Sequence, residues 1–184
     1  MRRHIRTLTA RHEPTGPVLA HAKSGLGAFI GIGAVGGLAS LTGLPLLVAP
    51  LGATAVLVFG QPGSPLAQPA NVFGGYLLAT LMGVTAALLF PGQWEMSAVA
   101  VGCAIALMSI FRVTHPPAGA VPLVALGAPL QSASLFGTIL IGCCSLIGLA
   151  VMHHRLPPRA HYPRRPEPGS TPVSENDLKA GERV

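Results

Sequence analysis

Residues 72–90 read VFGGYLLATLMGVTAALLF, a run of nineteen residues without a charged side chain. As a helix, the run measures about 28 Å, which matches the hydrocarbon thickness of a bilayer of about 30 Å. Around it, the 129 residues from Ser24 to Met152 contain only two fully charged side chains, Glu95 and Arg112. Ordinary soluble domains need a solvated surface and carry about 25% charged residues. The stretch therefore predicts an all-α, polytopic membrane protein whose solvent is lipid.

Six apolar segments lie in this region, four of them long and two short. We expect full spans at 24–44, 72–90, 96–111 and 132–152. The short segments are 45–59, interrupted by Pro50 and Gly52, and a stretch that begins at Pro117 and ends at Leu126. Proline suits the first turn of a helix, while the residue before it is extended. The short segments therefore predict two half-helices, each of which crosses only part of the bilayer.

The two short segments also resemble each other. PLGATAVLVFG at 50–60 aligns with PAGAVPLVALG at 117–127, an offset of 67 residues, and after a four-residue deletion 72–74 aligns with 135–137. The order of features is the same, so we predict a two-fold internal repeat with halves at about 24–90 and 95–152. Broken helices at matching places in two halves indicate a transport site near the bilayer midplane.

The number of crossings stays open between four and six. The basic tails, 1–23 and the Pro/Arg-rich segment 153–184, predict cytoplasmic termini in the inner (plasma) membrane, which requires an even number. We expect 153–184 to be largely disordered. If the short segments cross, the halves are inverted and the loop 91–95 lies outside; if they re-enter, that loop is cytoplasmic. We favour six crossings.

Several classes of function have no support in the residues. The net charge of +6 comes from residues that flank apolar segments, so we predict no nucleic-acid partner. The apolar region has neither a second carboxylate nor a nucleophile–base pair, so we predict no enzyme activity. We also expect no metal and no cofactor, because the cysteines read as packing residues and the terminal histidines as interfacial ones: Cys103, Cys143, Cys144, His153, His154 and His161.

The run RVTHPPAGA at 112–120 carries a resemblance. Together with PLGAT at 50–54 and SPLAQ at 64–68, it resembles the HPP family of integral membrane proteins over roughly residues 20–153. The resemblance implies a small multi-spanning protein, generally described with four spans and thought to be a transporter. Some plant and cyanobacterial members are associated with nitrite transport. It implies transport here, without fixing the substrate.

The residues themselves suggest a cradle for a small monovalent anion such as nitrite. A half-helix that begins at Pro117 directs unpaired amides toward the break, and the first half does the same. Arg112 adds a full positive charge and the Thr54 hydroxyl adds a donor. The predicted binding residues are Gly52, Ala53, Thr54, Arg112, Thr114, His115, Ala118, Gly119 and Ala120, with Pro50, Pro116 and Pro117 as structural residues.

Each reading has an alternative. Arg112 ends a helix, where it can bind the last carbonyls or extend to lipid headgroups. His115 either hydrogen-bonds backbone freed by the prolines or carries a proton. For the whole chain, the alternative is a structural or assembly subunit that forms a homo-oligomer through the glycine-rich first helix, with the pairs Gly27–Gly31 and Gly33–Gly37. Cation transport has less support, because 24–152 contains no Asp.

Overall fold

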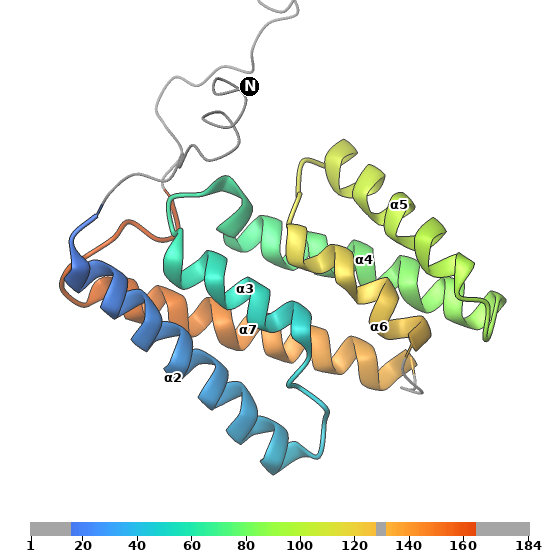
Figure 1. The fold of residues 1–184 in the computed structure, drawn as a ribbon, viewed down its shortest axis with the longest axis horizontal. Helices are drawn as coiled ribbons and strands as arrows, with labels where there is room; N and C mark the ends of the chain where they lie inside the picture. Colours follow the sequence, from blue (N-terminus) through green and yellow to red (C-terminus); the bar gives the residue numbers. More distant parts are fainter. Residues whose placement is uncertain (1–15, 128–131, 165–184) are drawn as a thin grey trace, which may run out of the picture.

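The computed structural model describes residues 16–127 and 132–164, and in these ranges it contains helices and no strands (Figure 1). The predicted all-α class is confirmed for this part of the chain. The helices are α2 (Val18–Thr42), α3 (Ala49–Gly60), α4 (Pro69–Leu89), α5 (Glu95–Ile110), α6 (Val121–Gly127) and α7 (Ser132–Arg155), with short 3₁₀ helices η1 (Pro65–Ala67) and η2 (Pro116–Ala120).

Three helices, α2, α4 and α7, are long and apolar enough to cross a membrane. The prediction of four full spans is not confirmed, because α5 has 16 residues and therefore measures about 24 Å, less than the hydrocarbon thickness of about 30 Å. Two short segments are present as predicted, with small shifts at their starts. Helix α3 begins at Ala49 with Pro50 in its first turn, and the second segment begins as η2 at Pro116 before it continues into α6.

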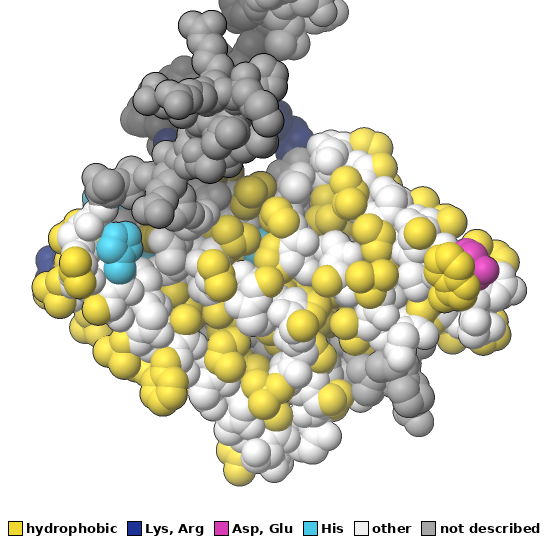
Figure 2. All heavy atoms as spheres, viewed as in Figure 1, with side chains coloured by type: hydrophobic (Ala, Val, Ile, Leu, Met, Phe, Trp, Pro, Cys, Tyr) yellow, Lys and Arg dark blue, Asp and Glu magenta, His cyan; other side chains and the backbone are white. Residues whose placement is uncertain are grey.

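Consecutive helices run in alternating directions (Figure 1). The start of α2 and the end of α7 lie at one end of the bundle, which we call the basic end because it carries Lys23, Arg155, Arg159 and Arg164. The turn between α4 and α5 lies at the opposite end, next to Glu95, and Figure 2 shows acidic side chains only there on the face in view. The rest of that face is dominated by apolar and uncharged side chains.

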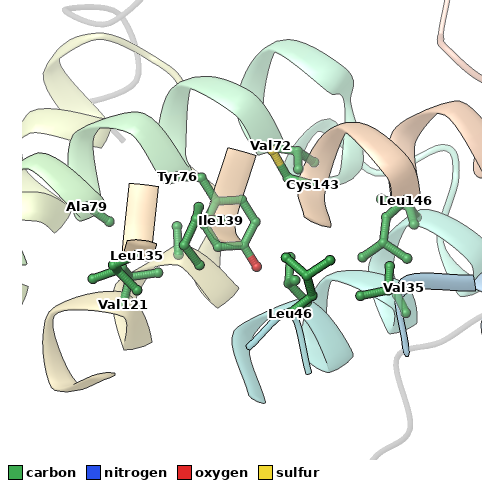
Figure 3. Packing of buried hydrophobic residues seen from close by; sticks show 14 of the residues in the cluster. Val35, Leu46, Val72, Tyr76, Ala79, Val121, Leu135, Ile139, Cys143 and Leu146 are labelled. Atoms are coloured by element: carbon green, nitrogen blue, oxygen red, sulfur yellow. The ribbon is translucent and has the colours of Figure 1, made fainter. Parts of the chain in front are cut away.

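Helices α4 and α7 pack against each other at the centre. Helix α4 also contacts α5 and α6, while α7 also contacts α2 and α3. Tyr76 of α4, which is fully buried, lies in the middle of the apolar cluster (Figure 3). Two glycines permit close approach in this region: a Cβ on Gly83 would lie 2.8 Å from the Pro122 Cα, and one on Gly142 would overlap the Leu51 side chain.

Helix α2 is longer than the apolar run predicted. Its glycines lie on two faces, one buried and one exposed. It begins at Val18 rather than at Ser24, so part of the expected tail 1–23 is helical. Gly27 and Gly31 are buried, where a Cβ would meet the ring of Phe59. Gly33 and Gly37 are exposed, with open space where a Cβ would stand.

The expected tail at 153–184 is corrected in its first part. Helix α7 continues to Arg155, and residues 156–164, which we call the C-terminal strap, fold back toward the loop between α3 and α4 (Figure 1). Hydrogen bonds hold this return, because the Tyr162 hydroxyl donates to the Ala67 carbonyl at 3.0 Å. Residues 1–15 and 165–184 lie outside the described residues.

Candidate functional site

The residue before each short helix is extended in both halves. Val48 (φ −103°, ψ 143°) precedes α3 and His115 (φ −135°, ψ 100°) precedes η2, and these two positions correspond under the offset found in the sequence. A proline follows within two residues of each, which disfavours helical backbone just upstream. The first segment places an apolar side chain at this position and the second an ionisable one. At this position, only the second segment contributes an ionisable side chain to the bundle interior.

His115 is fully buried and hydrogen-bonded at both ring nitrogens. Its Nδ1 lies 2.8 Å from the Leu66 carbonyl oxygen, and its Nε2 lies 2.8 Å from Thr54 Oγ1. Thr54 Oγ1 also lies 2.6 Å from the Tyr76 hydroxyl. Thr54 and Tyr76 are fully buried too. These three side chains, which we call the buried triad, join α3, α4 and the start of η2.

The acceptors fix the direction of each hydrogen bond. The Leu66 carbonyl can only accept, so Nδ1 of the imidazole donates to it. In the neutral ring Nε2 then accepts, and the Thr54 hydroxyl donates to it. The Thr54 oxygen in turn accepts from the Tyr76 hydroxyl. The triad is thus a continuous chain of donors that runs from Tyr76 to the loop between α3 and α4.

Helix α4 holds the second segment in place through short contacts. A Cβ on Gly75 would lie 2.7 Å from the His115 Cβ, so only glycine lets the segment approach this closely. The Asn71 side-chain amide donates to the Thr114 carbonyl at 3.0 Å. The imidazole also packs edge-on against the Tyr76 ring, with centroids 5.2 Å apart. These contacts position His115 toward Thr54.

The structure brings together only some of the predicted binding residues. The Thr54 hydroxyl is already bonded within the triad, and the Ala118 amide donates to the His115 carbonyl at 3.0 Å. The expectation of an unpaired Ala118 amide is therefore corrected: the 3₁₀ turn that starts at Pro116 consumes it. The remaining candidates are less buried, since Gly52 and Ala53 are exposed and Thr114, Gly119 and Ala120 are partly exposed. Of the structural prolines, Pro50 and Pro117 are buried and Pro116 is exposed.

Three polar residues of the interior were not predicted from the sequence. Tyr76 completes the triad, and the buried hydroxyls of Thr80 and Thr138 have no hydrogen-bond partner among the described residues. Thr80 lies on α4 and Thr138 on α7, the two helices that pack at the centre. The signal available in the sequence was the presence of hydroxyl groups inside otherwise apolar spans. Buried hydroxyls without a partner are rare in proteins.

Arg112 lies at the end of α5 and takes no part in the triad's hydrogen bonds. Its φ is +59°, its amide donates to the Ser109 carbonyl at 3.1 Å, and the next amide, of Val113, donates to the Met108 carbonyl at 2.9 Å. This pair of bonds is the Schellman motif, in which the left-handed position usually carries glycine. The side chain is exposed. Arg112 thus ends the helix through its backbone and leaves its charge at the surface.

Replacing Arg112 by glycine is expected to raise the free energy of unfolding by about 1 kcal/mol, because glycine adopts a left-handed conformation without the steric penalty of a Cβ. Thermal unfolding of the purified protein in detergent measures the change. Arg112→Ala is the matched control, since it removes the same guanidinium but keeps the Cβ. Equal stability of both variants would contradict this explanation.

Comparison with known proteins adds a family match. The family model described as "HPP, transmembrane region" matches residues 13–163. Two curated relatives, both described as transmembrane proteins of Dictyostelium discoideum, are 38% identical over 85 residues and 40% identical over 82 residues. These alignments cover 44% and 42% of this chain but 30% and 26% of the relatives, so the chain spans less than a third of their length. No solved structure matches the chain.

Proposed function

This chain belongs to the HPP transmembrane family, and from that premise we propose that it is a transporter or channel for a small solute, most simply a monovalent inorganic anion such as nitrite. We propose no catalytic step. The observation that carries the proposal is the buried triad. An ionisable side chain inside a membrane bundle is costly to keep there and marks a solute or proton pathway by default.

The location of the triad supports this assignment. Helix α3 contacts η2, and the hydrogen bond between Thr54, in the second turn of α3, and His115, just before η2, joins the two short segments. Helices that start inside the bundle interrupt the backbone there, and such interruptions are tolerated where protein or a cavity surrounds them. Thr80 and Thr138 supply two further hydroxyls for a solute. The centre of the bundle therefore offers polar groups from α3, α4, α7 and η2.

We further propose that the two halves are inverted copies and that the chain crosses the membrane six times. The contacts of α4 with α5 and α6 repeat as the contacts of α7 with α2 and α3, which is the pattern expected if α2, α3 and α4 correspond to α5, α6 and α7. The alternating helix directions agree with this. We place the protein in the plasma membrane. By the positive-inside rule, its basic end then faces the cytoplasm.

The charge of the interior favours an anion over a cation. Among the described residues the sole carboxylate is Glu95, which begins α5 at the far end from the strap. Protonation of His115 at Nε2 places a positive charge beside Thr54 and converts that nitrogen from acceptor to donor. The Thr54 hydroxyl must then turn to another acceptor, which opens a donor site for an anion. On this proposal, anion entry and protonation of the triad favour each other.

The decisive experiment is a comparison of Thr54→Val with Thr54→Ser in proteoliposomes. Valine keeps the shape of threonine but removes the hydroxyl that joins His115 to Tyr76, so we expect nitrite uptake to fall at least tenfold. Serine keeps the hydroxyl, and we expect uptake within about threefold of the wild type. The protein content of each vesicle preparation is matched by immunoblot. Uptake by Thr54→Val at the wild-type rate would refute the proposal.

A structural or assembly role remains as a second candidate, because α2 presents the exposed pair Gly33 and Gly37. Small residues four positions apart let another helix approach closely, so this face suits a homo-oligomer contact. The same proteoliposome experiment distinguishes the transport role from the structural role. A purely structural subunit would show no nitrite uptake above empty vesicles, even with wild-type protein.

A further inference from the structure

A pocket of about 420 Å³ lies at the basic end, between the last turn of α7 and the C-terminal strap. Its walls include His154, Arg155, Arg159, His161 and Tyr162. The volume falls in the range of about 300–1,000 Å³ that is typical of small-ligand sites. The pocket is distinct from the buried triad, because the described residues that line it belong to the end of α7 and the strap.

The strap that forms one wall is fixed by hydrogen bonds to α2, to η1 and to Gln68, the residue that joins η1 to α4. Lys23 of α2 donates from Nζ to the carbonyls of Leu156 and Pro158, each at 2.6 Å. The Arg164 amide donates to Gln68 Oε1 at 2.8 Å, close to the bond between Tyr162 and Ala67. Burial raises the pKa of Tyr162 to about 12. The pocket is therefore built before any ligand arrives.

The opposite wall is also fixed. His154 is buried on α7 and hydrogen-bonds the Val58 carbonyl at 2.7 Å, while its ring lies 5.4 Å from the ring of Tyr162. The Ala160 amide donates to the His154 carbonyl at 3.2 Å, which closes the strap onto the helix end. The two arginines of the pocket thus project from a braced turn.

The charge of this pocket is not balanced within the part of the chain that the structure describes. Arg155 and Arg159 line it, and the single described carboxylate, Glu95, begins α5 at the opposite end of the bundle. Arg159 donates from Nε to the Arg155 carbonyl at 3.2 Å, which leaves the two terminal nitrogens of its guanidinium directed elsewhere. No group of three metal-type ligands is assembled among the described residues. The chemistry of the pocket is that of an anion site.

We propose that this pocket binds a phosphate group. Two exposed guanidinium groups beside the exposed His161 match the several oxygens of a phosphate, which guanidinium binds in a bidentate manner. The pocket lies at the end of a spanning helix, where headgroups are found, so the phosphate comes from an anionic lipid headgroup or from the free ion. Because binding joins α7 to the strap, it stabilises the folded chain.

The test uses the full chain and the double variant Arg155→Gln/Arg159→Gln. Binding is measured as the shift of the thermal midpoint in detergent with sodium phosphate against sodium chloride at equal ionic strength. It is measured again in nanodiscs of phosphatidylcholine with and without phosphatidylglycerol. The variant Arg112→Gln is the charge control, because it removes an arginine charge from an exposed, described residue that does not line the pocket.

We expect the wild type and the control to be stabilised, and the double variant to bind at least tenfold more weakly. Stabilisation by sodium phosphate identifies the free ion as a ligand, and stabilisation by phosphatidylglycerol alone identifies the lipid headgroup; both support a phosphate site. No stabilisation of the wild type in either medium, or equal binding by the double variant, overturns the proposal. The readout is independent of nitrite uptake, so this proposal and the transport proposal can fail separately.

Discussion

Replacing His115 by alanine is expected to lower the free energy of unfolding by about 3–5 kcal/mol and to abolish solute uptake. The substitution leaves a cavity beside Tyr76, because the ring centroids of Tyr76 and His115 lie 5.2 Å apart in the native protein. It also leaves the Leu66 carbonyl and the Thr54 hydroxyl without the partners that they have in the native protein. Buried polar groups that lose a partner account for about 1–3 kcal/mol each. Thermal unfolding in detergent measures the loss.

Two variants complete this test. His115→Gln keeps a donor and an acceptor in the side chain, so it should recover part of the lost stability. His21→Ala removes an exposed imidazole from α2 and should change stability by less than about 0.5 kcal/mol. If His115→Ala unfolds at the same temperature as His21→Ala, the hydrogen bonds of the triad do not hold the bundle together.

The second large effect is expected from the contact between α4 and α6. Gly83→Ala places a methyl group 2.8 Å from the Pro122 Cα and 3.1 Å from the Ala125 Cβ. The Pro122 atom belongs to the backbone, so the two helices must separate, and overpacking of this kind lowers stability by about 1–3 kcal/mol. Because α6 continues from η2, the displacement also reaches the segment that carries His115. We expect reduced uptake together with reduced stability.

The same substitution at an open position is the control. Gly148 of α7 is exposed and has nothing within 4 Å of an added Cβ. There the better helix propensity of alanine, about 1 kcal/mol relative to glycine, should leave stability unchanged or slightly raised. Thermal midpoints of the two variants, measured side by side in one detergent, give the comparison. Destabilisation of equal size at both positions would show that close packing is not the cause.

The helices that span most of the bundle could be predicted from apolar run length, but their ends could not. The predicted span 72–90 became α4, Pro69–Leu89, whereas the predicted start at Ser24 moved to Val18. Lys23 lies just before the apolar run, yet helix α2 includes it. Its ammonium group has partners, because it donates to the strap carbonyls of Leu156 and Pro158. A hydropathy pattern reports which residues tolerate lipid, and a helix can continue beyond them when a charge has a partner elsewhere in the fold.

Two residues of the triad were predicted as site residues and the third was not. His115 directly precedes Pro116, and Thr54 follows Pro50 by four residues, so the prolines that mark broken helices identify both. Tyr76 lies inside an uninterrupted span, and its bond to Thr54 joins residues 22 positions apart. The sequence also could not show that the Ala118 amide is used by the His115 carbonyl, because this depends on a 3₁₀ turn rather than an α-helical one at Pro116. The first fact depends on tertiary structure, and the second depends on the local backbone conformation after Pro116.

On the proposal that α5 crosses the membrane, this helix is shorter than the hydrocarbon layer around it. It has 16 residues, and its side chains Val99 and Ile105 are 54% and 51% exposed, so acyl chains contact it if α5 crosses the membrane as proposed. Its length of about 24 Å is roughly 6 Å less than the mean hydrocarbon thickness, and such mismatch costs fractions of a kcal/mol per ångström. On the proposal of six crossings, the bilayer thins beside α5, and shorter acyl chains relieve the compression. On that same proposal, hydrophobic mismatch gives the protein a preference for thin membranes.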